Sequence, residues 1–512
     1  MEMCEMWVDL PLEQRKQYEK LITNFASLSE AFAQKEDDGD SNVAPIVNSK
    51  FQETAFQRCF NAYAEDIANT SYDASINAGE KKYLIGIKTF GLKAGDQKIA
   101  QFKSIAGSSE WARLINQMKQ NAIGLTTKNE INQANHELYL KLARMISVVR
   151  NERIKSSKEN LRGFKLDNIP VEAVYHVLMP SSKNEPPRIS VGETSYSSID
   201  IDNIKIHGCT TVKKPQNFMF TDGIHEYKWS ATDSQLSMRF NNTEIVLEQW
   251  PVYYVEDAFS FFEKMGNNAS KKFKESHSWM LDVQPYSGFN AFMGQPKMAR
   301  KDQAREKWIA SLEKRYAVDL TEAQLTELDS KLKALLLSNW NNAEKRPEMV
   351  KLRQQLIDYV RGLHNNELLE KIQKRVYRPS DELELRIPNS WEFHQRYPHF
   401  FTDKDIFQPN SNKCVKDKDA RTFTLRFLPS GDMIDAYINQ SNGKAIESCG
   451  KQSILGEWIL RDVFQLQPYE PLTQNRLAEM GINAIRLTKD DNVIDLSFIW
   501  IDPDNKPADL WC

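Results

Sequence analysis

Two strand-like segments near the N-terminus carry a carboxylate and an ammonium group that together could cleave a phosphodiester. Asp73 lies in SYDASI and Lys88 lies in YLIGIKTF, with a Gly-containing turn between the two segments. A hairpin of this kind brings an acid on its first strand opposite a Lys on its second. Carboxylates bind Mg²⁺, and a Lys orients the attacking water or stabilises the charge that develops on the phosphate. We therefore interpret Asp73 as a metal ligand and Lys88 as the residue that positions or activates the water.

Glu53 could supply a further carboxylate, near the start of the preceding helix. That helix is predicted in SKFQETAFQRCFNAYAEDIA, where apolar residues recur at helical spacing. Residues 50–120 then read as helix, strand, turn, strand and helix, the last helix covering GDQKIAQFKSIAGSSEWARLINQMK. The strand of Lys88 has the apolar neighbours of a buried strand, namely Leu84, Ile85, Ile87 and Phe90. A Lys in such surroundings needs a partner, because burying an unpaired charge is costly.

These residues resemble the PD-(D/E)XK nuclease superfamily over roughly residues 50–120. The pattern of that superfamily is a helix with an early Glu, an Asp at a strand start, and an acid or Gln two positions before a Lys. The resemblance implies Mg²⁺ as cofactor, with Asp73 as the principal metal ligand, Glu53 as an accessory metal ligand and Lys88 as the catalytic lysine. Gly86 departs from the pattern, because it occupies the position of the acid or Gln. Glu53 is our candidate for a displaced acid.

Two other sets of residues offer similar chemistry. Gln101 and Lys103 form a literal Q-x-K, but they lie in helix-like text, KIAQFKSI. A second set lies within 202–228 and consists of Asp202, Glu226 and Lys228, with His225 beside them. No helix with an early Glu precedes that set, and the surroundings of its Lys are polar. We rank both sets below the N-terminal hairpin, and the second remains its rival as the active site.

The chain divides into three zones, which predict an α+β multidomain protein. Residues 1–257 are predicted to form the nuclease domain, with a mixed α/β core at about 50–120 and a β-rich extension over 171–257. Residues 258–377 are predicted to be a helical linker or middle region. Its loop KKFKESHSWMLDVQPYSGFNAFMGQPKMARK suits a nucleic-acid backbone, because it mixes basic and aromatic residues, and suits a solvated linker equally. Residues 378–512 are again strand-like.

Polar side chains cluster after a strand in this third zone. The residues that could contact DNA are Gln440, Asn442, Lys444, Lys451, Gln452, Ser453 and Arg461. Amide side chains pair with adenine in the major groove, and basic side chains pair with guanine. Composition alone is also compatible with a plain hydrophilic turn.

The amino-acid sequence of the third zone resembles that of the B3-like DNA-binding domain of some bacterial restriction endonucleases. The phrases that carry the resemblance are IPNSWEFHQRYPHFF, LPSGDMIDAYINQSNGKAIES, KQSILGEWILRDVFQL, YEPLTQNRLAEMGINAIRLTK and IDLSFIWI. The resemblance implies a β pseudobarrel that holds the major groove with two arms. One arm would include Gln440 to Lys444, with Lys451 to Ser453 and Arg461 at or near the DNA.

The overall composition is compatible with DNA binding but does not require it. The net charge of the 512 residues is −3, so a nucleic-acid footprint must be a local patch. The six cysteines contain no CxxC pair, which predicts isolated reduced thiols. No segment has the layout of a signal peptide or the ~20 apolar residues of a membrane-spanning helix, so we expect a cytoplasmic protein without a membrane partner.

Together these features predict a type II restriction endonuclease that hydrolyses double-stranded DNA with Mg²⁺, leaving 5′-phosphate and 3′-hydroxyl ends. We expect a homodimer or higher homo-oligomer, because both strands must be cut. Host DNA would be protected by a separate methyltransferase, because the chain has no methyltransferase-like motif. A non-catalytic sequence-specific DNA-binding protein is an alternative, supported by Gly86. A nuclease subunit that depends on a partner ATPase is another, because the chain lacks a P-loop.

Overall fold

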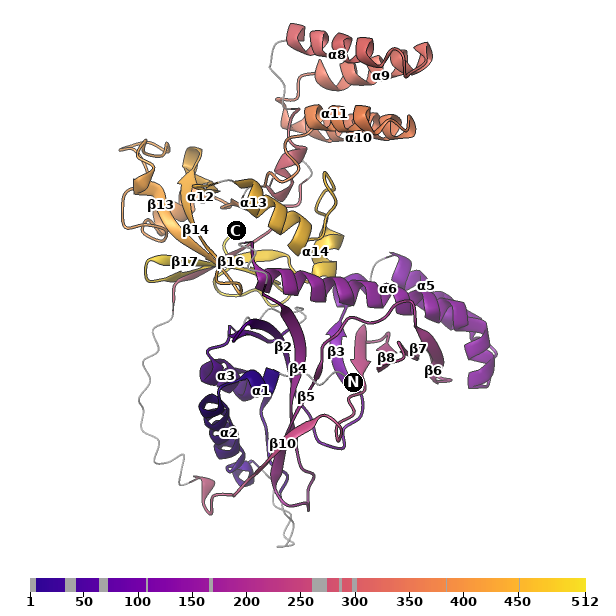
Figure 1. Ribbon diagram of the computed structural model, residues 1–512, viewed down its shortest axis with the longest axis vertical. Coiled ribbons are helices and arrows are strands. Elements are labelled where there is room, and N and C mark those ends of the chain that lie inside the picture. The colour runs from indigo at the N-terminus through magenta and orange to yellow at the C-terminus, as the bar shows by residue number, and fades with distance from the viewer. Residues whose placement is uncertain are drawn as a thin grey trace.

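The protein has an α+β fold, seen here in a computed structural model (Figure 1). The structure describes residues 6–32, 43–63, 72–106, 109–164, 169–259, 274–284, 288–296, 302–383, 385–450 and 452–512. Within these residues the strands form three sheets, and none of the three closes into a barrel. The structure therefore shows a β-rich C-terminal domain, and it does not confirm the closed β pseudobarrel that we expected there.

The first sheet contains the hairpin predicted around Asp73 and Lys88. Its strand order is β1 (Ala74–Ala78), β2 (Lys81–Thr89), β4 (Val171–Pro180), β5 (Arg188–Ser195) and β10 (Val246–Pro251). β1 and β2 are antiparallel, whereas β2 and β4 are parallel. A parallel pair needs a long crossover, and this one includes the 35-residue helix α6 (Lys128–Arg162). A capping box between Thr127 and Glu130 begins that helix.

The two faces of this sheet are covered by different layers. Helices α1 (Met6–Asp9), α2 (Leu12–Ala26) and α3 (Ser49–Phe60) pack on one face, against Ile76, Ile85 and Ile87. The other face carries Leu84 and Tyr175 in a second core, which it shares with α6 and the second sheet. Strand residues alternate between faces, so Gly86 and Lys88 lie on the same face as Leu84.

The second sheet has the order β3 (Gln97–Gln101), β9 (Gln235–Met238), β8 (Glu226–Ser230), β7 (Lys214–Thr221) and β6 (Lys205–Thr211). The structure differs here from the helix expected over residues 95–119. Residues 97–101 are a strand, and only α4 (Lys103–Ala106) and α5 (Ser109–Asn121) are helical. Pairing with β9, more than 130 residues away, overrides the helical spacing of the sequence.

Helix α6 also contacts the C-terminal domain, as Figure 1 shows where it lies beneath α14 (Gln474–Met480). The buried Arg153 donates hydrogen bonds to the carbonyl oxygens of Ala478 at 3.0 Å, Glu479 at 2.5 Å and Gln101 at 2.9 Å. The indole Nε1 of Trp458 donates to the carbonyl oxygen of Glu159 at 3.1 Å. One helix therefore packs against both the N-terminal sheets and the C-terminal domain.

The C-terminal domain is built on a seven-stranded sheet. Its order is β11 (Ser276–Met280), β16 (Ala484–Asp490), β17 (Val493–Ile499), β13 (Thr422–Phe427), β14 (Met433–Asn439), β15 (Ala445–Ser448) and β12 (Leu385–Arg386). β11 comes from the region expected to be helical. It joins this sheet because His277 and Trp279 are buried beside the strand β16, more than 200 residues later.

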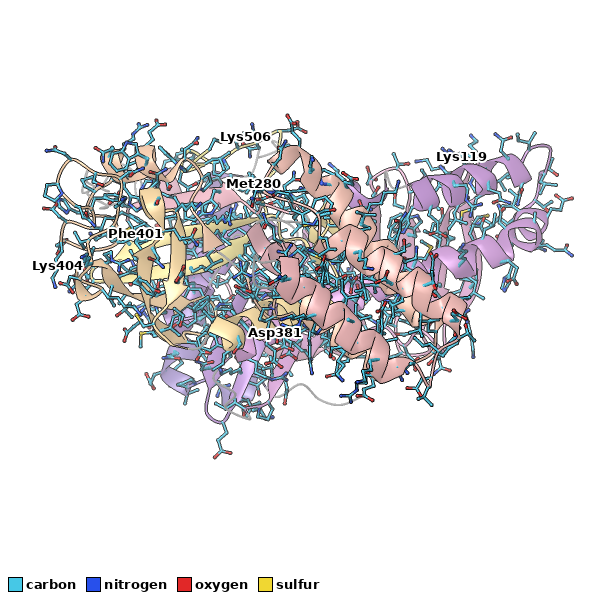
Figure 2. All side chains as sticks on the ribbon, turned by 90° about the horizontal axis from the view of Figure 1, so that it is seen from above. Lys119, Met280, Asp381, Phe401, Lys404 and Lys506 are labelled. Atoms are coloured by element: carbon cyan, nitrogen blue, oxygen red, sulfur yellow. The ribbon has the colours of Figure 1, made fainter. Side chains whose placement is uncertain are left out.

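The remaining part of the middle region is helical, as expected. It comprises α8 (Asp302–Tyr316), α9 (Glu322–Leu336), α10 (Arg346–Gly362) and α11 (Asn366–Val376), which project from the C-terminal domain in Figure 1. Seen from above in Figure 2, Lys404 of the C-terminal domain and Lys119 of α5 lie at opposite ends of the molecule. Among the described residues, no helix is long and apolar enough to cross a membrane.

His176 on β4 makes the stability of the first sheet sensitive to acid. Its ring is fully buried against Trp7, Tyr18 and Phe56, at centroid distances of 5.3, 5.6 and 5.3 Å. Burial lowers the pKa of His176 from 6.5 to about 3. Between these values the unfolded chain binds a proton that the folded chain does not, so stability is complete above pH 6.5 and falls as the pH falls.

We expect His176→Phe to remove this acid sensitivity. As the pH falls from 6 to 4, the free energy of unfolding measured in urea should decrease by about 1.4 kcal/mol more per pH unit for the wild type than for the variant. Equal slopes for the two proteins would contradict the expectation. His136→Phe, on an exposed part of α6, is the matched control and should leave the slope unchanged.

Candidate active site and nucleic-acid interface

Asp73 and Lys88 lie together at the open end of the β1–β2 hairpin. The register pairs Ala74 with Ile85, so Asp73 is opposite Gly86 and diagonal to Lys88 on the same face. The Nζ atom of Lys88 lies 3.5 Å from Oδ2 of Asp73. The same oxygen accepts a hydrogen bond from the backbone N–H of Ile87 at 2.6 Å. Both side chains remain partly exposed, at 26% for Lys88 and 33% for Asp73, so the pair is fixed in position yet open to a substrate.

Gly86 has no room for a side chain. A Cβ atom at this position would lie 2.7 Å from Cδ1 and 2.8 Å from Cε1 of Tyr175, and 3.1 Å from Cε1 of Tyr196. The Tyr175 ring therefore occupies the space that an acid or Gln would need. The departure of this chain from the D/E-x-K pattern has a packing cause in the next strand of the sheet.

Two stacked tyrosines and a buried arginine form the floor of the site. The rings of Tyr175 and Tyr196 stack with centroids 4.0 Å apart, and the Lys88 ammonium lies 5.9 Å from the Tyr175 centroid. The Arg150 guanidinium lies 5.3 Å from the Tyr196 centroid and donates to the carbonyl oxygen of Ser197 at 2.8 Å. Burial, and then the neighbouring Tyr175, raises the pKa of Tyr196, and the negative charge of Asp73 acts in the same direction. The Tyr196 hydroxyl therefore stays protonated at neutral pH.

Lys88 and Lys103 both act electrostatically on Lys98 of β3. Lys98 on β3 donates to Oε1 of Gln101 at 3.0 Å. Desolvation lowers the pKa of Lys98, and the positive charges of Lys88 and Lys103 lower it further, so both of these lysines lie within electrostatic reach of Lys98. We name Lys88, Lys98 and Lys103 the lysine rim. Clustered ammonium groups of this kind favour a polyanion such as a nucleic-acid backbone.

Glu53 is carried by α3, on the opposite face of the sheet from Asp73. It forms an ion pair with Lys50 at 2.9 Å, and its side chain is 24% exposed. The residue of α3 that reaches the end of β2 is Gln52, which is fully buried and accepts a hydrogen bond from the Thr89 hydroxyl. The sequence signal for Gln52 was its place among the apolar residues of one helix face.

The carboxylates near the hairpin are few, and this bears on the expected Mg²⁺. Among the residues that the structure describes, no group of three or more His, Cys, Asp or Glu side chains could hold a metal ion. Protein-bound Mg²⁺ commonly uses one or two carboxylates and takes its other ligands from water and substrate phosphates. Asp73 fits that minimal arrangement, because it is partly exposed and fixed by the Ile87 N–H. To join it, Glu53 would have to leave Lys50 and reach around the edge strand β1 from the other face of the sheet.

The rival set at 202–228 is not brought together in one ion-pair network. Glu226 pairs with His207 at 3.0 Å, whereas Lys228 lies 3.7 Å from Asp96. Asp202 is exposed in a turn, where its N–H donates to Oδ1 of Asp200. The Q-x-K of Gln101 and Lys103 spans the end of β3 and the start of α4, and its Lys belongs to the lysine rim.

The predicted DNA-reading loop forms a fixed turn after β14. Gln440 and Asn442 both have φ near +63°, a backbone conformation that Asn tolerates better than most residues. The loop is held by Asn412, whose side-chain N–H donates to Oδ1 of Asn442 at 2.7 Å and whose carbonyl accepts from the Asn442 N–H. Lys444 follows, and it lines a cavity of about 220 Å³ shared with Trp279.

The other predicted DNA contacts lie around α13 (Gln452–Glu457). Lys451 lies outside the described residues, as does the side chain of Gln452, while Ser453 is exposed at the start of the helix. Arg461 is 16% exposed and donates to the carbonyl oxygens of Ser380, Leu466 and Gln467 and to Asp381. Its guanidinium is hydrogen-bonded within the protein, and its predicted contact with DNA stays a prediction.

Sequence reasoning missed the tyrosine floor, because Arg150, Tyr175 and Tyr196 come from three separate elements. No spacing pattern joins α6, β4 and the end of β5. The one available signal was Gly86 itself, since a glycine in an apolar strand often marks a close approach of another group.

Comparison with models of known protein families finds none that matches this chain, and comparison with curated proteins finds no match either.

Proposed function

We propose that the protein is a Mg²⁺-dependent endonuclease that hydrolyses double-stranded DNA at specific sites, as a type II restriction enzyme does. The observation that carries the proposal is the Asp73–Lys88 pair, with Nζ and Oδ2 3.5 Å apart, Asp73 directly before β1 and Lys88 on β2 of one hairpin. The lysine rim, to which Lys88 belongs, would supply positive charge for a phosphodiester backbone. The resemblance of the hairpin to the PD-(D/E)XK pattern, with Gly86 as its departure, supports the same reaction.

Each side chain has a distinct task in this proposal. Asp73 would hold the metal, and Glu53 could act as a second carboxylate only if it left Lys50 and reached around the edge strand β1, because α3 covers the other face of the sheet. Bound Mg²⁺ would supply a Lewis acid for the phosphate oxygens. The Lys88 ammonium would orient the attacking water and stabilise the charge that grows on the phosphate. The Ile87 N–H and the Tyr175 ring hold Asp73 and Lys88 in the required geometry.

The C-terminal domain would select the DNA sequence. We propose that it is a B3-like domain, on the basis of its long sequence resemblance and its β-rich fold. Gln440 and Asn442 present amide groups at the tip of the β14–β15 connection, and Lys444, Lys451, Gln452 and Ser453 complete the proposed contact surface. Amide and ammonium groups of this kind read base edges in the major groove or bind phosphates.

A site-specific enzyme of this kind has further requirements. We propose a homodimer or higher homo-oligomer, because two strands of opposite polarity must be cut. We also propose that it acts in the cytoplasm, where a separate methyltransferase would protect the host DNA.

The test is run-off sequencing of plasmid DNA incubated with the purified chain and Mg²⁺, with EDTA as the matched control. We expect discrete breaks at one short sequence, with 5′-phosphate ends, and no breaks in EDTA. Absence of cleavage with Mg²⁺, Mn²⁺ and Co²⁺ would refute the proposal.

A second candidate is a non-catalytic sequence-specific DNA-binding protein with a PD-(D/E)XK-like domain. Gly86 favours it, because the Tyr175 ring fills the space where the second metal-binding acid of that pattern would stand. Retained specific binding without cleavage under any divalent ion would support this candidate.

We expect Gln440→Ala to weaken specific DNA binding about tenfold, because a bidentate amide–base contact contributes about 1–3 kcal/mol. Affinity for a duplex of scrambled sequence should change less than twofold. Gel-shift titration against both duplexes measures the two affinities. Gln467→Ala, outside the loop, is the matched control, and an equal loss for both duplexes would contradict base reading by Gln440.

A further inference from the structure

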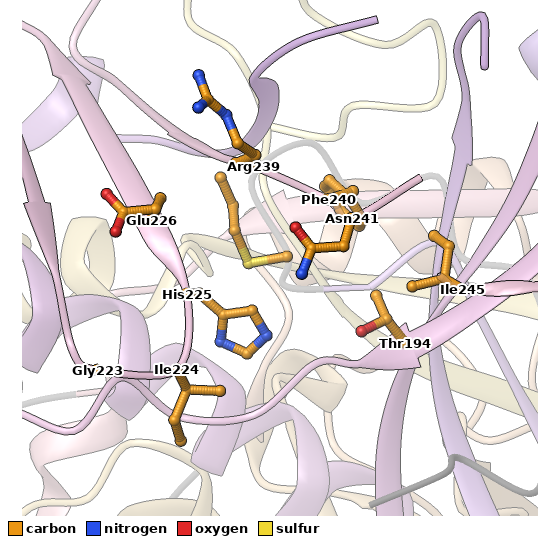
Figure 3. Close-up of a pocket in the computed structure, with 10 residues that line it drawn as sticks. Thr194, Gly223, Ile224, His225, Glu226, Arg239, Phe240, Asn241 and Ile245 are labelled. Atoms are coloured by element: carbon orange, nitrogen blue, oxygen red, sulfur yellow. The ribbon is translucent and has the colours of Figure 1, made fainter. Parts of the chain in front are cut away.

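A cavity of about 370 Å³ lies between the first and second sheets. Thr194 of β5 lines one wall, and residues 223–226, at the start of β8, line another. The segment that follows β9 lines a third wall with Phe240, Asn241 and Ile245. Figure 3 shows the His225 imidazole in the cavity, with the Asn241 amide and the Thr194 hydroxyl on the same side of it. Neither of the two functions assigned above to this chain uses this cavity.

The cavity wall combines flat apolar surface with a few polar groups. Phe240 and Ile245 are buried, and Met238 completes the apolar side. The polar side consists of the Thr194 hydroxyl, the His225 ring and the Asn241 amide. Pockets for a flat heterocycle have this composition, because apolar groups stack on its faces while a few donors and acceptors contact its edge.

His225 is a neutral hydrogen-bonding group in this wall. Desolvation lowers its pKa, the nearby Asp222 charge opposes that change, and the Arg150 charge adds to it. A neutral imidazole offers one donor and one acceptor. Its Nδ1 atom is buried and has no hydrogen-bond partner among the residues described here. Because Nδ1 has no accessible surface it does not face the cavity, so the ring nitrogen that a bound group would contact is Nε2.

The cavity adjoins the Asp73–Lys88 site through aromatic contacts. The Phe240 ring meets the Tyr175 ring edge to face, with centroids 5.2 Å apart. Tyr175 lies beneath Lys88 and is the register partner of Thr194 across β4 and β5. Two aromatic rings, Phe240 and Tyr175, therefore connect a group bound in the cavity to Lys88.

We propose that this cavity binds a nucleobase, by stacking on the apolar wall and by hydrogen bonds to His225, Asn241 and Thr194. The inference rests on the proposed function, because it adds a base-binding subsite beside the proposed site of phosphodiester cleavage. The base belongs either to a nucleotide rotated out of the DNA duplex or to a free nucleotide, and the two sources differ in the experiment below.

The test uses Ile224→Trp, which places an indole at the cavity. Ile224 lines the cavity and is 69% exposed, so the larger side chain need not disturb the core. Val212→Trp, in the turn between β6 and β7, is the matched control on the same sheet. Asn241→Ala is a second variant, at an exposed position of the cavity wall.

Two arms are measured in EDTA, so that no cleavage is needed. In the first, gel-shift titration compares a fully paired duplex with the same duplex carrying one adenine opposite an abasic site, since an unpaired base rotates out at little cost. In the second, calorimetry follows the binding of the four deoxynucleoside monophosphates. Plasmid cleavage with Mg²⁺ is recorded separately for every variant.

We expect the wild type and Val212→Trp to prefer the duplex with the unpaired base about tenfold, and Ile224→Trp and Asn241→Ala to lose most of that preference. That result assigns the cavity to a base of DNA. Monophosphate binding that Ile224→Trp abolishes assigns it to a free nucleotide. No monophosphate binding, together with a preference that is absent or unchanged in Ile224→Trp, overturns the proposal. If the wild type bound the base as expected but did not cleave plasmid DNA with Mg²⁺, only the proposed function would be overturned.

Discussion

Asp73→Asn and Lys88→Met are each expected to lower the rate of DNA cleavage about a thousandfold while leaving DNA affinity within a few-fold of the wild type. Loss of one group that stabilises charge in a transition state typically reduces the rate by about 10²–10³. Asp73→Asn removes the negative charge proposed to hold the metal. Lys88→Met keeps an unbranched apolar stem against Tyr175 and removes only the ammonium group. Each change is close to isosteric, so the hairpin should remain folded.

The double variant distinguishes a shared site from two separate effects. If Asp73 and Lys88 act on one phosphate, removal of both should reduce cleavage little more than removal of either, because residues that act as a unit are not additive. Single-turnover cleavage of plasmid DNA measures the rates, and gel-shift titration in Ca²⁺ measures the affinity.

Matched controls come from the rival set. Asp202→Asn and Lys228→Met make the same two substitutions on the second sheet, where Asp202 is exposed in a turn and Lys228 lies 3.7 Å from Asp96. Their cleavage rates should stay within about threefold of the wild type. If these variants lost activity while those at Asp73 and Lys88 kept it, the active site would have to be reassigned to residues 202–228.

The hairpin was predictable from sequence because its information is local. SYDASI and YLIGIKTF are strand-like segments separated by a short turn, and the structure has the strands β1 (Ala74–Ala78) and β2 (Lys81–Thr89) there. The ion pair between Asp73 and Lys88 follows from that register. The helix α3 was predictable for the same reason, since its apolar face repeats at helical spacing.

Features that depend on distant partners were not predictable in this way. β3 and β11 lie in segments that we expected to be helical or linker-like. Each is a strand because it pairs with a strand far along the chain. The guanidinium of Arg461 donates to nearby Leu466 and Gln467 and also to Ser380 and Asp381, which lie about 80 residues earlier in the chain. A single sequence does not encode such pairings in any local spacing.

Gly86 shows both cases, because its place in the pattern is visible in the local sequence whereas its contact with Tyr175 is not. It leads to the second prediction. In the sequence, Gly86 occupies the position where the D/E-x-K pattern has an acid. The structure explains the absence of a side chain there, because a Cβ atom at Gly86 would lie 2.7 Å from the ring of Tyr175. We therefore expect Gly86→Glu to lower the free energy of unfolding by more than about 4 kcal/mol, because it inserts a charged side chain into a filled, buried space. Restoring the literal D/E-x-K spacing should then abolish cleavage instead of increasing it.

Gly86→Ala separates steric effects from charge effects. One methyl group against the Tyr175 ring should lower the free energy of unfolding by about 2 kcal/mol, within the usual range for overpacking a core. Gly91→Ala is the matched control, because a Cβ at that position would meet nothing within 4 Å. Urea unfolding measures all three variants. A stable Gly86→Glu protein with faster cleavage would mean that Tyr175 moves aside and that the site accepts a second acid. A destabilised one would mean that this chain must bind its metal with Asp73 and a carboxylate from outside the hairpin, or else bind DNA without cutting it.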